Sequence, residues 1–242
     1  MNEPKNPYDI PSNSRAAITD ILPRVNLAAL IFLAALLALG FIALAILGSG
    51  GWAQFARNPL RPAVAIALLL FAAATPICGC HISPAIEQDR SNDWIFPLLL
   101  AMGLLMGWLS AYCDQHNRWT IGSSAIRYAG LIAFLAGVAL RLAAIRTLGQ
   151  RFTVWVAIQQ DHQLETSGLY RWVRHPSYTG AILNLVGWAM VFRSLAGILL
   201  AIAMSQLLIT RITPEETLLK NTFGHAYTAY QKRSWKLLPF VF

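Results

Sequence analysis

The 242-residue sequence predicts an all-α fold, a polytopic membrane helix bundle of about six spans. Of its residues, 56% are hydrophobic and only 12% are charged. Soluble domains carry about a quarter charged residues. The chain therefore has too few charges to coat a surface that faces water on all sides, and long uncharged runs supply the membrane-spanning helices.

Six apolar runs define the predicted spans. Two of them are separated so closely that they predict a tight helical hairpin. The runs are residues 25–56, 62–86, 94–113, 122–148, 175–192 and 194–210. Gly48, Gly50 and Gly51 indicate the end of the first helix, and Pro76 weakens the second.

These runs divide the chain into three parts. Residues 1–24 form a polar arm without the apolar core of a secretory signal peptide. Residues 25–148 form a four-helix transmembrane region. Residues 149–242 hold the hairpin, an amphipathic C-terminal helix and most of the polar motifs.

Basic residues predict the orientation. With the N-terminus in the cytoplasm, fourteen of the 19 Lys and Arg residues fall on that side, as the positive-inside rule requires. Both termini are then cytoplasmic, in a multi-pass protein of a bacterial inner membrane or the endoplasmic reticulum. The other five are Arg57, Arg61, Arg118, Arg127 and Arg193.

The net charge of +8 is explained by this orientation and by contacts with anionic membrane lipids, so no nucleic acid partner is expected. The three cysteines predict neither a disulfide framework nor a metal site. Cys78 and Cys80 lack zinc-ligand spacing, and no second ligand cluster accompanies them.

The polar stretch at residues 159–180 combines basic, aromatic and histidine side chains between two spans. Pro176 disfavours helical backbone at His175 but suits the first position of the helix that follows. We therefore expect His175 at the N-terminus of a helix, where backbone N–H groups and the helix dipole favour a carboxylate.

A second polar cluster, Arg211 with Glu215 and Glu216, follows the last span. Arg211 and Glu215 are four residues apart and could share a helix face, although Pro214 leaves the continuity of the helix open. A surface ion pair beside a helix N-terminus is the alternative interpretation.

Together these motifs resemble a known family. Residues 167–180 (SGLYRWVRHPSYTG), Arg211 with Glu215 and Glu216, residues 223–227 (FGHAY) and residues 238–240 (LPF) are similar to the isoprenylcysteine carboxyl methyltransferase family. Phospholipid N-methyltransferases share parts of the pattern. The resemblance implies a membrane methyltransferase that uses S-adenosyl-L-methionine in a cytosol-facing pocket and takes a lipid-like or prenylated substrate from the bilayer.

The resemblance also implies roles for individual residues. Arg211 would bind the substrate and act in catalysis with Glu216, and the remaining positions would surround the cofactor. Those positions are Gln159, His162, Leu164, Glu165, Tyr170, His175, Pro176, Ser177, Tyr178 and Glu215. Glu165 stands where the family usually has an apolar residue.

The chemistry of methyl transfer leaves several functions open. A carboxylate nucleophile is already ionised at neutral pH, whereas an amine must lose a proton and would need His175 or Glu216 as a base. The alternatives are therefore a lipid N-methyltransferase, an NADPH-dependent sterol-type reductase, which also carries a late His-Pro element, and a non-enzymatic membrane scaffold.

Overall fold

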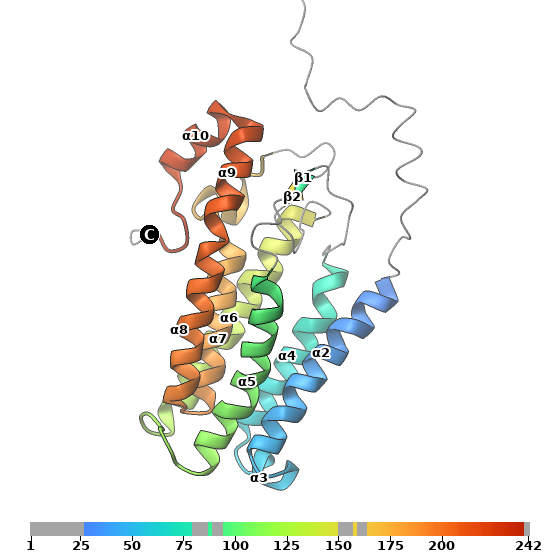
Figure 1. Ribbon diagram of the computed structural model, residues 1–242, viewed down its shortest axis with the longest axis vertical. Helices are drawn as coiled ribbons and strands as arrows, with labels where there is room; N and C mark the ends of the chain where they lie inside the picture. Colours follow the sequence, from blue (N-terminus) through green and yellow to red (C-terminus); the bar gives the residue numbers. More distant parts are fainter. Residues whose placement is uncertain (1–26, 79–86, 89–93, 150–156, 159–163, 240–242) are drawn as a thin grey trace, which may run out of the picture.

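The protein forms one helical bundle (Figure 1). The computed structural model describes residues 27–78, 87–88, 94–149, 157–158 and 164–239. The bundle helices in this part of the chain are α2 (Leu27–Gly48), α4 (Leu60–Ile77), α5 (Ile95–Gln115), α6 (Ala125–Leu148), α7 (Pro176–Val191) and α8 (Leu195–Thr210). A short helix, α3 (Trp52–Ala56), precedes α4.

The all-α prediction is confirmed for the described residues, with one small exception. The strands β1 (Glu87–Gln88) and β2 (Ala157–Ile158) are two residues long and pair antiparallel. Each bundle helix matches one of the six predicted apolar runs. The first helix, α2, ends at Gly48 as expected, and Pro76 lies in the last turn of α4.

Five helical segments are long and apolar enough to cross a membrane. They are α2, α4, α5, α6 and the stretch Leu195–Phe223, which contains α8. The sixth bundle helix, α7, has 16 residues, or about 24 Å at 1.5 Å per residue. Since a hydrocarbon core is about 30 Å thick, α7 is a short helix held between α6 and α8. The chain is a multi-pass membrane protein.

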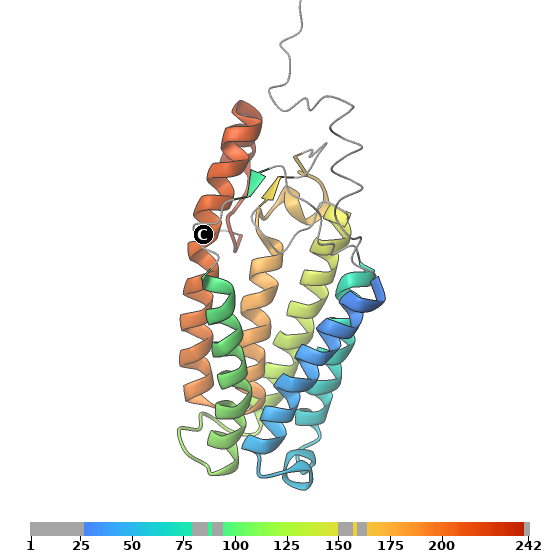
Figure 2. The ribbon, with the colours of Figure 1, turned by 45° about the vertical axis from the view of Figure 1, so that its right-hand side comes forward.

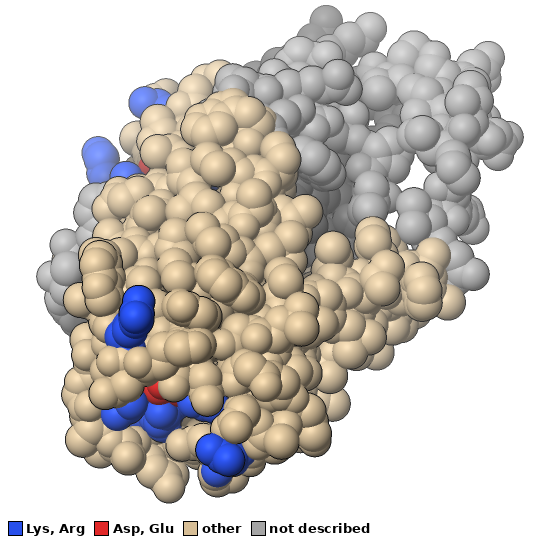
Figure 3. Space-filling view, turned by 60° about the horizontal axis from the view of Figure 1, so that its bottom comes forward, with Lys and Arg blue, Asp and Glu red and all other residues tan. Residues whose placement is uncertain are grey.

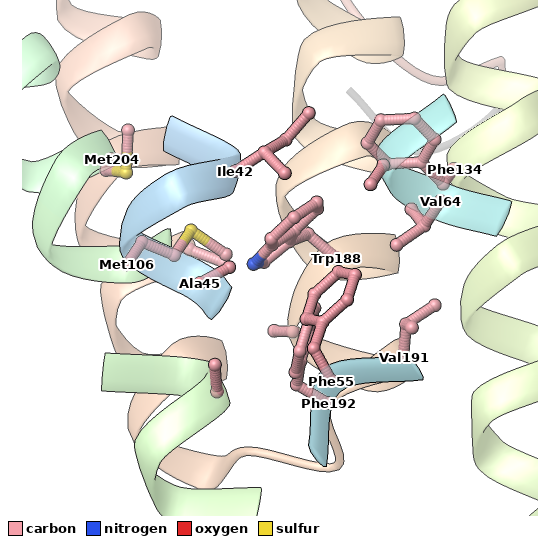
Figure 4. Packing of buried hydrophobic residues seen from close by; sticks show 14 residues of the cluster. Ile42, Ala45, Phe55, Val64, Met106, Phe134, Trp188, Val191, Phe192 and Met204 are labelled. Atoms are coloured by element: carbon pink, nitrogen blue, oxygen red, sulfur yellow. The ribbon is translucent and has the colours of Figure 1, made fainter. Parts of the chain in front are cut away.

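Aromatic side chains fill the centre of the bundle (Figure 4). The Trp188 ring meets Phe41 edge-on at 4.5 Å between ring centroids and lies 5.0 Å from the Phe192 ring. On the outer surface, Phe32 is 70% exposed and Leu70 is 67% exposed. Such exposure of large apolar side chains is what lipid requires and water would penalise.

Glycines bring α6 and α7 into backbone contact. A Cβ atom on Gly187 would lie 2.6 Å from the Phe134 nitrogen, and one on Gly137 would lie 2.6 Å from the Gly180 carbonyl oxygen. Without an interhelical hydrophobic effect in lipid, small residues allow close packing to hold membrane helices together. This crossing fixes the start of α7 relative to the bundle.

A charged cluster closes the bundle end near α3, the end that Figure 3 brings forward. The fully buried Asp114 side chain accepts hydrogen bonds from Arg61 and Arg127, and Arg193 Nε lies 3.3 Å from Asp114 Oδ1. Arg127 also donates to the Val191 carbonyl at 2.6 Å. Three of the five arginines that the orientation prediction assigns to this side therefore turn inward onto one carboxylate.

The predicted hairpin has a tight connection. Only residues 192–194 separate α7 from α8. Arg193 has a φ of +48°, and the Ser194 side chain caps α8 by accepting from the Gly197 N–H at 2.9 Å. The left-handed residue reverses the chain, and the serine satisfies one of the free N–H groups of the new helix.

Replacing Gly187 with alanine tests the α6–α7 contact. We expect Gly187→Ala to lower the free energy of unfolding by about 1–3 kcal/mol, since the added methyl must displace the α6 backbone. Gly40→Ala is the control, because a Cβ at Gly40 meets nothing within 4 Å. Thermal unfolding in detergent, followed by the reactivity of the buried Cys113 thiol, measures both. Equal stability of the two variants would contradict the backbone contact.

Replacing Asp114 with asparagine tests the charged cluster. The change leaves three arginines without their anion, and we expect a loss of about 3 kcal/mol or more in unfolding free energy. Arg118→Gln, at an exposed position near the same end, should change stability little. The same thiol-reactivity assay applies, and a wild-type melting temperature for Asp114→Asn would show that the cluster contributes nothing.

Candidate active site at the α7–α9 end of the bundle

The last span continues directly into a further helix. Arg211 alone separates α8 from α9 (Ile212–Phe223), so Pro214 does not break the chain of turns. It stands in the first turn, where a missing N–H costs no hydrogen bond. The amphipathic helix predicted after the last span therefore begins at Ile212. It breaks at Gly224, which has a φ of +53°, before α10 (His225–Arg233).

The two polar clusters predicted from the sequence lie together. Figures 1 and 2 both place α9 and α10 at the end of the bundle opposite α3, beside the start of α7. The 3₁₀ helix η2 (Gly168–Arg171) leads into α7 at this end. As expected, α7 begins at Pro176, and His175 is the residue before it, with non-helical backbone.

The C-terminal tail, residues 234–239, is hydrogen-bonded to the backbone at Arg174 and His175. The Arg174 N–H donates to the Trp235 carbonyl at 2.8 Å, and the His175 N–H donates to the Lys236 carbonyl at 3.1 Å. Val173 and Trp235 form a parallel bridge. The backbone before Pro176 is thus held in place by a segment about 60 residues later in the chain, and His175 is 4% exposed.

Glu216 joins α9 to this segment. Its Oε1 accepts a hydrogen bond from Arg174 Nε at 2.8 Å and lies 3.3 Å from His175 Nε2, while its Oε2 accepts from Gln231 Nε2 at 3.2 Å. Arg174 also donates to the carbonyls of Gln231 and Ser234. Both oxygens of the carboxylate are therefore occupied by protein groups from α9's neighbours.

The adjacent Glu215 has a different environment. Its Oε2 accepts from the Tyr178 hydroxyl at 3.0 Å, and its Oε1 lies 3.8 Å from His175 Nδ1. The Glu215 side chain is 31% exposed, against 14% for Glu216. Successive residues on a helix point in different directions, so one glutamate faces the tail and the other remains accessible.

Three buried tyrosines line this end of the bundle. The Tyr230 hydroxyl donates to the Tyr170 carbonyl at 2.5 Å, and Tyr227 is 1% exposed. Burial raises the pKa of Tyr230 to about 12 and raises the pKa of Tyr170 beyond its usual range. Within the described residues, the Tyr227 hydroxyl has no hydrogen-bond partner. All three are neutral at pH 7 and can act as donors.

Two arginines border the site from the membrane side. Arg211 is 6% exposed, and its guanidinium carbon lies 4.1 Å from the centre of the Phe96 ring at the start of α5. It interacts electrostatically with the Tyr178 phenol. Arg141 passes across Gly180 of α7 and lies 5.1 Å above the Phe71 ring.

The structure brings most of the predicted site residues together. His175, Tyr178, Glu215 and Glu216 are in mutual contact, and Pro176 and Ser177 form the first turn of α7. The Tyr170 carbonyl accepts from Tyr230 of α10, and Arg211 is close enough to influence Tyr178 electrostatically.

Two of the remaining predicted residues, Leu164 and Glu165, lie on the approach to η2. Glu165 accepts from the Ser167 N–H at 2.9 Å, closing a turn just before this helix. Leu164 is half-buried. Gln159 and His162 lie outside the described residues. In the described part of the chain, no three His, Cys, Asp or Glu side chains are grouped so that they could hold a metal.

Sequence reasoning missed four contributors. Arg174 lies within the SGLYRWVRHPSYTG motif, but no role was predicted for it, and none was predicted for Arg141. Gln231 and Tyr227 lie on α10. Tyr227 ends the FGHAY motif but was given no role, and nothing in the local pattern distinguishes Gln231. The position of Arg174 directly before the His-Pro pair is the one signal that pointed to it.

Comparisons with known proteins identify a related family for this part of the chain. Residues 130–221 match the sequence model of the isoprenylcysteine carboxyl methyltransferase (ICMT) family. The resemblance seen in the motifs is confirmed for this region. This ICMT-like region, residues 130–221, covers most of α6, all of η2, α7 and α8, and most of α9. It contains Arg174, His175, Tyr178, Glu215 and Glu216, but not Gln231 of α10.

Curated relatives of the ICMT-like region include three named methyltransferases. Protein-S-isoprenylcysteine O-methyltransferase B of Arabidopsis thaliana is 36% identical over 46% of this chain and 58% of its own length. A probable counterpart from Oryza sativa subsp. indica is 32% identical over 48% and 62%. The Homo sapiens enzyme is 36% identical over 46% and 40%. The chain thus spans less than two thirds of the length of each of these relatives.

One solved structure is also similar, a eukaryotic intramembrane Ras methyltransferase ICMT. It is 23% identical, with a TM-score of 0.46, and the match covers 73% of this chain and 77% of that chain.

Removing the Arg174 side chain tests the attachment of the tail. We expect Arg174→Ala to accelerate proteolysis within residues 224–239 and to cost about 3 kcal/mol, because Glu216 loses a partly buried ionic partner. Arg174→Lys should recover little, since a lysine cannot reproduce the guanidinium fork. Limited proteolysis with mass-spectrometric mapping measures the effect.

The control for this prediction is Arg171→Ala, three residues earlier, where the side chain is exposed. It should leave the cleavage rate near that of the wild type. If Arg174→Ala and Arg171→Ala were cleaved equally fast, Arg174 would not fasten the tail.

Proposed function

We propose that this protein is an integral-membrane methyltransferase that transfers a methyl group from S-adenosyl-L-methionine to the carboxylate of a lipid-like or prenylated acceptor. The observation that carries the proposal is the contact of His175 and Tyr178 with Glu215 and Glu216. It joins the two motifs of the ICMT-like region at one end of the bundle.

The residues at this end fit the proposed cofactor. S-adenosylmethionine is a cation with amino, carboxylate and hydroxyl groups. Glu215 is an accessible carboxylate beside aromatic rings, and the His175 and Tyr178 rings lie 5.6 Å apart. Aromatic faces and a carboxylate both favour a cation. The buried Tyr227 hydroxyl, which has no partner in the described residues, is a free donor for such a ligand.

The protein groups have distinct roles in the proposed reaction. When bound, S-adenosylmethionine supplies an electrophilic methyl group. Glu215 and Tyr178 hold the cofactor, and the first turn of α7 at Pro176 and Ser177 borders it. Arg211 orients the acceptor carboxylate through its bidentate fork. The surrounding helices exclude water, so that positioning supplies most of the rate enhancement.

A carboxylate acceptor suits the site better than an amine. Glu216, which the family resemblance assigns to catalysis, accepts hydrogen bonds at both oxygens, and one of them faces His175 Nε2. His175 and Glu216, the two candidate bases for an amine acceptor, are both engaged in these hydrogen bonds. A carboxylate acceptor needs no base, because it is already ionised. We therefore propose that Glu216 positions His175 and the tail, and that O-methylation is the reaction.

The location of the site follows the orientation predicted from the basic residues. We propose that the α9–α10 end and both termini face the cytoplasm, of a bacterial inner membrane or of the endoplasmic reticulum. The methyl donor would then enter from the cytosol and the acceptor from the bilayer.

Substitutions separate cofactor binding from turnover. We expect His175→Ala and Glu215→Ala to weaken S-adenosylmethionine binding about tenfold or more, by loss of a buried ring and of a charged acceptor. Arg211→Ala should lower turnover while largely keeping cofactor affinity. Calorimetry on purified protein measures the affinities, and tritiated methyl transfer to prenylcysteine analogues, isoprenoid acids and phosphatidylethanolamine measures turnover.

Asn221→Ala, on the exposed face of α9, is the control and should match the wild type in both assays. NADPH binding without adenosylmethionine binding would indicate the reductase instead. Methyl transfer to phosphatidylethanolamine alone would indicate the N-methyltransferase. No cofactor binding by the folded wild-type protein would leave only a scaffold.

A further inference from the structure

The α3 end of the bundle carries more positive charge than its acidic residue can balance. Five arginines lie at this end against Asp114 alone, since the connecting residues 49–59, 116–124 and 192–194 contain no Asp or Glu. Figure 3 shows basic side chains gathered around an acidic residue on this face. The orientation predicted from the basic residues does not explain this surface, because it places the surface on the side where basic residues are depleted.

The buried part of this charge is also unbalanced. Arg61, Arg127 and Arg193 share the carboxylate of Asp114, so three guanidinium groups face one anion. Arg61 and Arg127 are 6% and 7% exposed, whereas 21% of the Arg193 side chain is exposed. A buried charge without an opposite charge is costly in free energy. The cluster therefore favours a further anion, and Arg193 is the member that such an anion can reach.

Arg193 has donors to spare at the surface. Its Nε lies 3.3 Å from Asp114 Oδ1 and its Nη2 lies 3.4 Å from Asn117 Oδ1, while Nη1 has no hydrogen-bond partner among the described residues. Arg118 follows Asn117 directly and is exposed. Guanidinium groups bind phosphate oxygens through pairs of N–H donors. Since Arg193 contacts the residue next to Arg118, both arginines can reach one phosphate group.

Strained backbone holds these two connections together. The Ile121 N–H donates to the Arg193 carbonyl and the Leu195 N–H donates to the Trp119 carbonyl, both at 2.8 Å. The φ angles of Asn117, Trp119 and Arg193 are 49°, 51° and 48°, and no other non-glycine residue in the described ranges has a positive φ. Such backbone persists where its surroundings fix it, and it is enriched at ligand-binding sites. The connections thus hold Arg193 at one place on the surface.

The surroundings of Arg193 indicate a lipid rather than a soluble anion. Trp119 is 65% exposed, as is typical of tryptophan at the membrane–water interface. The helix that follows Arg193 is α8, where Leu195, Leu199 and Ile202 are exposed at spacings that share one helix face. A phospholipid places its phosphate at the interface and its acyl chains in the hydrocarbon core, so one molecule would contact both features.

We propose that the α3 end binds an anionic phospholipid, whose phosphate contacts Arg193 and Arg118 and whose acyl chain lies along the exposed apolar face of α8. The negative charge of the lipid offsets the excess positive charge of the Asp114 cluster. This site lies at the end of the bundle opposite Glu215 and Glu216, and it does not depend on the proposed methyltransferase activity.

Native mass spectrometry of the full chain in detergent tests the site. The probes are phosphatidylglycerol, which has a net negative charge, and phosphatidylcholine, which has the same phosphate but no net charge. We expect phosphatidylglycerol to bind about tenfold more tightly, because arginines near a lipid surface attract net negative charge. Arg118→Gln should reduce this preference about fivefold, as expected for the loss of one arginine.

Two further variants separate the parts of the site. Arg57→Gln is the matched control, because Arg57 is also exposed at this end but lies in the α3–α4 connection. It should keep the preference for phosphatidylglycerol. Leu199→Asn changes the face of α8 that would hold the acyl chain. It should weaken binding of both lipids and leave the preference between them unchanged.

The outcomes decide between this site and two alternatives. Equal affinity for the two lipids, or an equal loss of preference in Arg57→Gln and Arg118→Gln, would overturn the site, because only a general attraction to the basic end would remain. Thermal unfolding with added inorganic phosphate is the second measurement. Stabilisation by phosphate as large as that by phosphatidylglycerol would identify a soluble anion as the ligand and overturn the lipid.

Discussion

The Glu216 carboxylate is the point at which the separate parts of the site depend on one another. It holds Arg174 and His175 from the start of α7 and Gln231 from α10. Arg174 and His175 precede Glu216 by 42 and 41 residues, and Gln231 follows it by 15 residues. A largely buried carboxylate with partners on both oxygens favours one geometry, because each partner left alone would cost free energy. Glu215 can then face outward without losing its position.

Each end of the bundle contains a carboxylate paired with basic side chains, but only the α9 end keeps a second, accessible carboxylate beside it. At the α3 end, one carboxylate binds three arginines and no accessible acid remains beside it in the described residues. At the α9 end, one glutamate is consumed by protein contacts while its neighbour stays 31% exposed. The first arrangement closes the bundle and the second leaves a charged group for a ligand. The difference lies in the number of cations that reach each acid.

The sequence predicted the features that depend on neighbouring residues alone. Proline geometry placed His175 before a helix that begins at Pro176, and uncharged runs located the bundle helices. Those rules failed where a partner is distant. The sequence assigned Arg127 only to the non-cytoplasmic side, whereas its side chain binds the buried Asp114. Nor did the sequence predict the hydrogen bond between the Arg174 N–H and the Trp235 carbonyl. A charged side chain can be buried only where the fold brings an opposite charge close to it. A single sequence does not show which distant residues the fold brings together.

The cluster around Asp114 also constrains how the chain assembles. Its members come from α4, α5, α6 and the α7–α8 connection, so they leave the ribosome in the order Arg61, Asp114, Arg127, Arg193. Asp114 of α5 follows Arg61 of α4, so its first partner is already synthesised. Arg127 and Arg193 are added by the later segments. Arg193 arrives last and least buried, with 21% of its side chain exposed. Insertion of the α7–α8 hairpin is thus the step that completes the cluster. A chain that stopped before this hairpin would lack the ion pair between Arg193 and Asp114.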